Sequence, residues 1–115
     1  MRHRKNNVKL DRNKTQRQAL LRTQIFSLVK NNRISTTDAK AKYLRSKIEK
    51  LITIAKKDTL TSRRQVYQAV GNKKIGDLVI KIAQKYKEKK GGYTRLTKIG
   101  YRKGDCALIT QIELL

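Results

Sequence analysis

The sequence contains no proline and no tryptophan, and it has only one phenylalanine, one cysteine and one histidine in 115 residues. Without proline, the ends of helices and strands must be marked by Gly, Asn and helix-capping residues. Without tryptophan, and with a single phenylalanine, a hydrophobic core has to be built from Ile, Leu, Val and Ala. The length and the 37 % hydrophobic content allow one domain with a modest core.

Long apolar segments are also missing. The longest runs, such as Leu78-Val79-Ile80, are far shorter than the roughly 20 residues that a membrane-spanning helix needs. Residues 1–7 lead into no apolar segment of the kind found in a secretory signal peptide. We therefore expect no membrane insertion and no secretion.

Groups that carry catalysis or bind metals are few. Cys106 is the only cysteine, so it forms no internal disulfide, and it has no Cys or His at the spacing of a zinc site. We expect it to be a small apolar residue of a strand. His3 is the only histidine, and the eight carboxylates include no close pair of the kind found in metal nucleases. The sequence therefore predicts no enzyme activity, no cofactor, no metal site and no small-molecule substrate.

Acidic residues are scarce beside basic ones. The chain has 30 Lys and Arg against 8 Asp and Glu, a formal net charge of +22 and a pI near 10.6. One Lys-rich helix would be explained as a solvated face, but this excess extends over the whole chain. Self-repulsion on this scale destabilises a compact isolated state, and a polyanion relieves it. The charge favours a nucleic-acid partner over an anionic membrane surface.

Apolar spacing predicts four helices. The clearest is the second, because its apolar stripe from Ala41 to Ala55 follows Ser35-Thr36-Thr37-Asp38, a variant of the capping box. Gly91-Gly92 marks the end of the last helix. The first helix is expected over residues 14–31, and the second is the helix after residue 38 that carries the apolar stripe. The third and fourth helices are expected over residues 59–70 and 73–90.

The C-terminal part changes to a period of two. Residues 106–114 alternate as a strand does, residues 93–101 are a second strand candidate, and residues 33–36 are a short third one. Residues 100–105 have the length and glycines of a hairpin connection. We therefore predict an α+β fold, with about four helices packed on one face of a small, mostly antiparallel sheet.

Residues 1–13 differ from the rest of the chain. They carry five Lys or Arg and, after Met1, only Val8 and Leu10 as aliphatic residues. This is too little apolar surface to fold independently. We expect a basic extended arm over residues 1–13 that gains order on an RNA target, followed by a single globular domain over residues 14–115.

The residues best suited to RNA contact are arginines, lysines and tyrosines. Arg holds phosphate bidentately, Lys supplies a point charge, and Tyr stacks on unpaired bases. For Tyr67 and Tyr86 a role in the core is at least as well supported, because both fall near apolar helix positions. The candidate RNA-binding residues are Arg2, His3, Arg4, Lys5, Lys9, Arg12, Lys14, Arg17, Arg22, Arg63, Arg64, Tyr93, Arg95, Tyr101, Arg102 and Lys103.

Several short blocks, in order along nearly the whole chain, are similar to one protein family. They are Met1-Arg2-His3-Arg4-Lys5, Gln18-Ala19-Leu20-Leu21-Arg22, Arg33-Ile34-Ser35-Thr36-Thr37, Glu49-Lys50-Leu51-Ile52-Thr53, Arg63-Arg64, and Gly91-Gly92-Tyr93-Thr94-Arg95 followed by Gly104-Asp105. On these blocks the sequence resembles the bacterial ribosomal large-subunit protein seventeen family. It departs from the family at Cys106, where Ala is usual, and at Leu108-Ile109-Thr110, where Met-Ala is frequent.

The resemblance implies an α+β body with a basic N-terminal arm. It also implies binding to large-subunit rRNA near the outer rim of the peptide exit tunnel, beside other ribosomal proteins, in a cytoplasmic or organellar ribosome. The sequence thus favours a structural rRNA-binding protein that supports subunit assembly and translation. A small basic DNA-packaging protein is the alternative, and a nuclease would need a carboxylate or histidine cluster that the sequence lacks.

Overall fold

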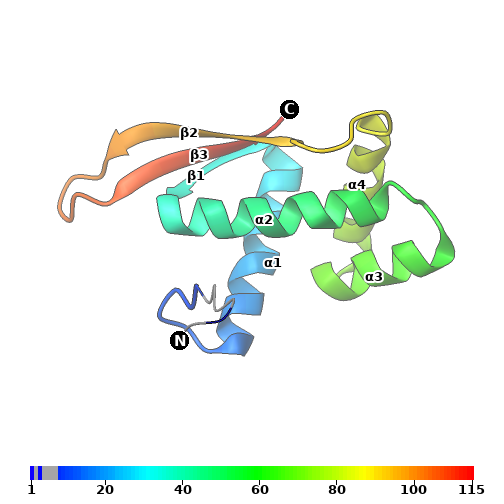
Figure 1. Cartoon of the computed structure of the whole chain (residues 1–115), viewed down its shortest axis with the longest axis horizontal. Coiled ribbons are helices and arrows are strands. Elements are labelled where there is room, and N and C mark those ends of the chain that lie inside the picture. Colours follow the sequence, from blue (N-terminus) through cyan, green and yellow to red (C-terminus); the bar gives the residue numbers. More distant parts are fainter. Residues whose placement is uncertain (2, 4–7) are drawn as a thin grey trace.

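The computed structural model describes residues 1, 3 and 8–115, and it has four helices and three strands (Figure 1). The predicted α+β fold is confirmed. The expectations for Arg2, Arg4 and Lys5 fall outside the described residues. In chain order the elements are α1 (Lys14–Asn31), β1 (Arg33–Thr37), α2 (Asp38–Ala55), α3 (Leu60–Val70), α4 (Lys73–Lys85), β2 (Thr94–Tyr101) and β3 (Leu108–Leu114).

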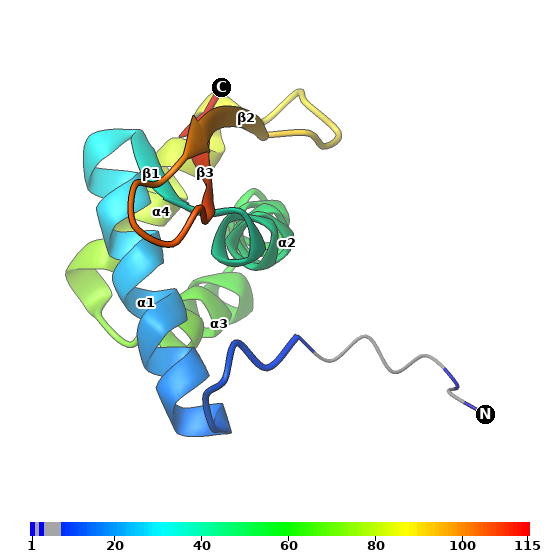
Figure 2. The same cartoon turned by 90° about the vertical axis from the view of Figure 1, so that its left-hand side faces the viewer.

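The three strands form an antiparallel sheet in the order β1-β3-β2. Ile112 of β3 lies opposite both Ile34 of β1 and Leu96 of β2, and it is fully buried. These three side chains form an apolar row across the sheet. The helices lie on one side of the sheet, with α2 running along it (Figures 1 and 2).

The core is built around α2. All six residues of its predicted apolar stripe are buried, and Ile25 and Leu28 of α1, Val66 of α3 and Val79 of α4 pack around them. The core is mainly aliphatic, as the absence of Trp and the single Phe predicted, and it also includes the buried Tyr86 and Tyr93. The buried residues of the stripe are Ala41, Leu44, Ile48, Leu51, Ile52 and Ala55.

Side-chain caps begin three of the four helices, but not the one for which a cap was predicted. Asn13 begins α1 and Thr59 begins α3 with complete capping boxes, and Asn72 caps α4. Thr37, at the start of α2, makes no side-chain cap hydrogen bond, so the predicted capping box is wrong. The side chain of Asp38 instead connects α2 to strand β3.

Asp38 joins the start of α2 to the sheet. Its carboxylate pairs with Lys42 at 2.8 Å and accepts a hydrogen bond from the buried Thr110 of β3 at 2.9 Å. The bond from Lys42, then that from Thr110, lowers the pKa of Asp38. A residue 72 positions away therefore fixes this helix end, which local sequence did not reveal.

The fourth helix is shorter than predicted, since α4 ends at Lys85 and not at residue 90. The next residue, Tyr86, is buried; its hydroxyl donates to the carbonyl oxygen of Leu115, and its ring lies 5.3 Å from that of Tyr93. Burial raises the pKa of Tyr86. This packing against the C-terminal residues favours turning the chain after Lys85 over continuing the helix.

The prediction for Cys106 is wrong. Its side chain is exposed, and it lies in the hairpin connection, two residues before β3 begins at Leu108. Its φ of 55° is in the left-handed region, and its backbone N–H donates to the carbonyl of Arg102 at 3.0 Å. The alternating pattern predicted a strand that begins at residue 106, two residues too early, because residues 106 and 107 belong to the connection between the strands.

The described part of the N-terminal arm turns before α1. Leu10 and Asp11 both have positive φ, and the backbone N–H of Arg12 donates to the carbonyl of Lys9 at 3.1 Å. Arg17 of α1 donates to the carbonyl of Arg12 at 2.6 Å. Over residues 8–13 the chain is therefore bent against the first turn of α1 and not extended throughout.

Gly76 sets the approach of α4 to α3. A Cβ atom there would lie 2.3 Å from Cδ1 of Tyr67, so Gly76→Ala is expected to force the two helices apart. Overpacking typically lowers the stability of a protein by about 1–3 kcal/mol, whereas the higher helix propensity of Ala over Gly raises it by at most about 1 kcal/mol. We expect a melting temperature lower by several degrees, measured by circular dichroism. Gly91→Ala is the control, because its Cβ would meet nothing within 4 Å; equal melting of both variants would contradict this account.

Candidate nucleic-acid interface

Few of the basic side chains are neutralised within the protein. The described part of the chain contains five ion pairs, against 30 Lys and Arg in the sequence. All five involve side chains that are at least partly exposed, where such pairs contribute little stability. The surface therefore keeps a large positive excess. The pairs are Lys42–Asp38, Arg45–Glu49, Arg63–Asp58, Arg95–Glu113 and Arg102–Asp105.

An open groove of about 600 Å³ lies between α1, α2 and α3. Figure 2 looks along α2 and shows α1 and α3 beside it. One face of α1, one turn of α2 and the C-terminal half of α3 line the groove, and none of its described lining residues is acidic. They are Lys14, Arg17, Gln18, Leu21, Arg22, Tyr43, Lys47, Gln65, Gln68 and Ala69.

The groove is lined by three of the predicted RNA-binding residues, Lys14, Arg17 and Arg22, which all lie on one face of α1. Helical spacing at i, i+3 and i+8 explains why they share that face. Lys47 and Tyr43 from α2 complete the site, with the Lys47 ammonium 5.6 Å from the centre of the Tyr43 ring. Their i, i+4 spacing was visible in the sequence, but the position of α2 beside α1 was not.

Arg22 also has a structural role at the rim of the groove. Its guanidinium approaches the carbonyl oxygens of Ala69 and Gln68 at 3.4 and 3.5 Å, and it lies against Gly71, which ends α3 in the left-handed conformation. A cation at a helix C-terminus is favourable because the last carbonyls carry partial negative charge. Arg22 thus links α1 to the end of α3 and fixes one wall of the groove.

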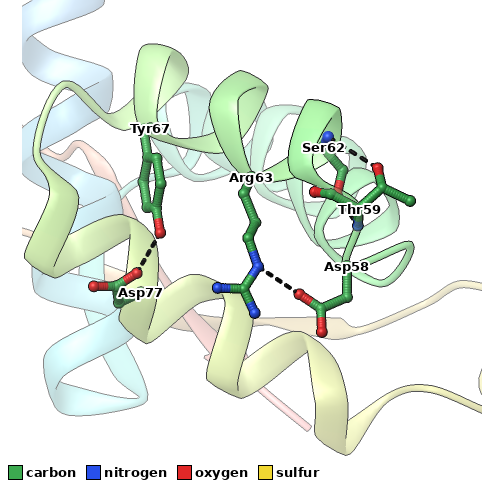
Figure 3. Close-up of polar contacts among 6 residues, drawn as sticks. All are labelled: Asp58, Thr59, Ser62, Arg63, Tyr67 and Asp77. Carbon is green, nitrogen blue, oxygen red and sulfur yellow. Dashed lines mark hydrogen bonds and ion pairs between the residues drawn. The ribbon is translucent and has the colours of Figure 1, made fainter.

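A second group of polar side chains lies at the exposed side of α3 and α4 (Figure 3). Arg63 pairs with Asp58 at 2.8 Å, which raises the pKa of Arg63. The hydroxyl of Tyr67 donates to Asp77 at 2.5 Å, and this bond raises the pKa of Tyr67. The two predicted RNA-binding residues Arg63 and Arg64 therefore differ in their contacts. Both are exposed, but only Arg63 pairs with a carboxylate in the described structure.

We expect Arg63→Ala combined with Arg64→Ala to keep the fold and to weaken RNA binding. If both arginines contact phosphates, the slope of log affinity against log salt falls by about one to two units. Arg64→Ala alone should account for about one unit without changing the melting temperature, because Arg64 makes no ion pair in the described structure. An unchanged slope with a lower melting temperature would show that the arginines serve packing instead.

The hairpin that connects β2 to β3 presents a third group. Tyr101 is 76 % exposed, and Lys103 is exposed beside it. Arg102 makes two hydrogen bonds to Asp105, at 3.1 and 2.6 Å, and the backbone N–H of Ala107 donates to the same carboxylate. These bonds shape the loop, and they occupy part of the Arg102 guanidinium that was expected to contact RNA.

The same contacts lower the pKa of Asp105 to about 2, chiefly through its bond to Arg102. A lowered pKa means that the ionised carboxylate stabilises the loop above pH 3.8, and that this contribution is lost as the pH falls from 3.8 through 2. We expect the Asp105 carboxyl to stay ionised between pH 5 and pH 3 in NMR titrations. In Arg102→Gln it should titrate closer to its ordinary value. Titration near 3.8 in both proteins would contradict the bidentate contact.

Tyr93 is the candidate residue that the structure places elsewhere. Its side chain is only 1 % exposed, its hydroxyl accepts a hydrogen bond from Lys56 at 2.9 Å, and that bond lowers its pKa. A ring inside the core has no free face for a base, so the expectation that Tyr93 stacks on RNA is wrong. Arg95, two residues later, is exposed and pairs with Glu113 across the sheet at 3.3 Å.

The remaining candidates lie apart from these groups. His3 and Lys9 are exposed near the N-terminus, and Arg12 is half-buried with its guanidinium donating to the carbonyl of Leu10 at 2.7 Å. Within residues 1, 3 and 8–115, no three His, Cys, Asp or Glu side chains gather where they could hold a metal ion. None of the helices in this part of the chain is long and apolar enough to cross a membrane.

Fold and surface together define a small, strongly basic α+β protein whose exposed cations far outnumber its carboxylates. The family model described as ribosomal protein L17 matches residues 20–115. The chain belongs to the ribosomal protein L17 family, which confirms the resemblance found in the sequence.

Three relatives, each named large ribosomal subunit protein bL17, align with the whole chain. The protein of Desulfosudis oleivorans is 48 % identical, and the alignment covers 56 % of its length. That of Desulforapulum autotrophicum is 43 % identical with 97 % covered, and that of Geobacter sulfurreducens is 47 % identical with 66 % covered. The chain thus spans nearly all of one relative and between a half and two thirds of the other two.

Proposed function

We propose that this chain is a structural, non-catalytic constituent of the large ribosomal subunit, where it binds rRNA. The observation that carries the proposal is the match to the ribosomal protein L17 family over residues 20–115. The charge supports it independently, because a net charge of +22 in 115 residues calls for a polyanionic partner.

Three surfaces are suited to the rRNA. They are the basic residues of the arm 1–13, the groove between α1, α2 and α3, and the hairpin tip around Tyr101 and Lys103. The globular domain 14–115 would hold the last two in a fixed relation, so that phosphate contacts supply affinity and the shape of the RNA sets the register. The resemblance to the family supports a position near the rim of the exit tunnel, beside neighbouring large-subunit proteins, in a cytoplasmic ribosome.

Sucrose-gradient sedimentation of a cell lysate tests this proposal. After a high-salt wash, the chain should sediment with large ribosomal subunits, because a structural protein with many phosphate contacts in a folded RNA site is retained. A loosely adsorbed basic protein should be lost from the same fractions. Recovery in a DNA fraction, with none in large subunits, would support the alternative of a DNA-packaging protein.

A further inference from the structure

The groove between α1, α2 and α3 contains more than positive charge. Beside Lys14, Arg17 and Lys47 it is lined by the half-buried ring of Tyr43 and by the amides of Gln65 and Gln68. Phosphate neutralisation alone requires neither an aromatic ring nor amides. Their presence in one acid-free groove suggests recognition of a planar, hydrogen-bonding group that is attached to an anion.

We propose that this groove binds one unpaired nucleotide of an RNA strand, with its base against Tyr43 and the two glutamines and its phosphates on the surrounding cations. The inference rests on the proposed function, and it specifies the kind of RNA element that the protein contacts. A volume of about 600 Å³ lies within the range of small-ligand sites, so the open groove has room for one nucleotide.

The placement of the side chains matches the chemistry of a nucleotide. Tyr43 offers a ring for stacking, and Lys47, one helical turn later, lies over this ring with its ammonium 5.6 Å from the ring centre. A base that takes the place of the ammonium over the ring brings its phosphate close to this charge. Gln65 and Gln68 are exposed on the wall that α3 forms, and each amide both donates and accepts, as the edge of a base requires.

The base must be unpaired to enter. In a double-stranded RNA helix the bases are stacked inside, and proteins contact mainly phosphates and 2′-hydroxyls, whereas bases in loops and bulges can leave the stack. An acidic peptide would satisfy the same cations, but its carboxylates would give the tyrosine ring and the glutamine amides no planar partner. The groove therefore favours a looped or bulged RNA nucleotide.

The test compares single-stranded and double-stranded RNA with the full chain. The probes are a short oligouridylate and an RNA duplex without bulges, and affinity is measured by fluorescence anisotropy. Tyr43→Leu should weaken binding to the oligouridylate by about 5- to 150-fold, the range for the loss of one base-stacking contact, and should leave duplex binding within about twofold. Tyr43→Phe should retain the affinity of the original chain.

Phe26→Leu is the matched control. Phe26 is an exposed aromatic residue of α1 outside the groove, and Lys30 lies 5.6 Å from its ring centre, as Lys47 does from that of Tyr43. The control should bind both probes as the original chain does. The double variant Gln65→Ala with Gln68→Ala changes only exposed side chains, so it is expected to fold and it tests the nucleotide site even if Tyr43→Leu does not fold. It should also weaken binding to the single strand and not to the duplex.

Each outcome bears on one of the two claims. If the folded groove variants bind the oligouridylate as tightly as the original chain, or lose single-strand and duplex binding equally, the groove has no nucleotide site. The proposed function would then still stand on co-sedimentation with large subunits. If the original chain binds neither RNA and is absent from large subunits, the proposed function itself is wrong.

Discussion

Ile48→Asp is expected to abolish folding of the chain. Ile48 is 1 % exposed at the centre of the buried stripe of α2, where it packs in the core shared by all four helices and the sheet. An unpaired carboxylate in this position costs several kcal/mol, comparable to the whole stability of a small domain. Leu51→Asp, one turn further along the same stripe, should behave alike. The measurement is the thermal melting curve of the purified variant by circular dichroism.

Ser46→Asp is the control for this experiment. Ser46 lies on the exposed side of the same helix, so the substitution adds the same charge to α2 without burying it. Its melting temperature should stay close to that of the original chain, since surface substitutions usually change stability by less than about 0.5 kcal/mol. A normal melting curve for Ile48→Asp would show that the stripe of α2 is not the centre of the core.

Removing the charge of the N-terminal arm is expected to have the largest effect on RNA binding. If Arg2, Arg4, Lys5, Lys9 and Arg12 are all changed to Gln, the slope of log affinity against log salt should fall by roughly three to four units. Affinity at physiological salt should fall by about a hundredfold or more, because each lost phosphate contact also loses its counterion release. The measurement is a salt titration of binding to large-subunit rRNA.

A control with the same loss of charge separates position from total charge. Replacing five exposed lysines elsewhere by Gln should reduce the slope less, because none of them belongs to the three proposed RNA-facing surfaces. Equal slopes for the two variants would mean that the arm acts only through net charge. The five control positions are Lys73, Lys74, Lys81, Lys85 and Lys87.

Elements that depend on local pattern could be predicted from the sequence. The first helix was predicted over residues 14–31 and is found there, with Asn13 as its N-cap and Asn32 as its C-cap. The stripe of α2 from Ala41 to Ala55 was predicted correctly, since its apolar spacing needs no knowledge of its partners. The antiparallel hairpin followed from alternation and from the glycines at residues 100 and 104.

Features that depend on distant residues were missed. Tyr93 lies in the sequence beside Arg95 at the start of the hairpin, but its hydroxyl accepts hydrogen bonds from Thr53 of α2 and from Lys56, the residue that follows this helix. Asp38 has the sequence position of a helix cap, yet its carboxylate accepts a hydrogen bond from Thr110 of β3. The groove required three helices to converge, so the chemistry of Tyr43 and the glutamines could not be assembled from spacing alone.

The central claim is that the chain binds large-subunit rRNA as part of the assembled subunit. The most direct measurement is a map of the nucleotides crosslinked to this chain in large subunits purified from cells that express it. The account predicts crosslinks confined to large-subunit rRNA, clustered around the exit tunnel rim, and formed by the arm, the groove and the hairpin tip. Crosslinks to DNA, or an absence of crosslinks in intact large subunits that contain the chain, would contradict it.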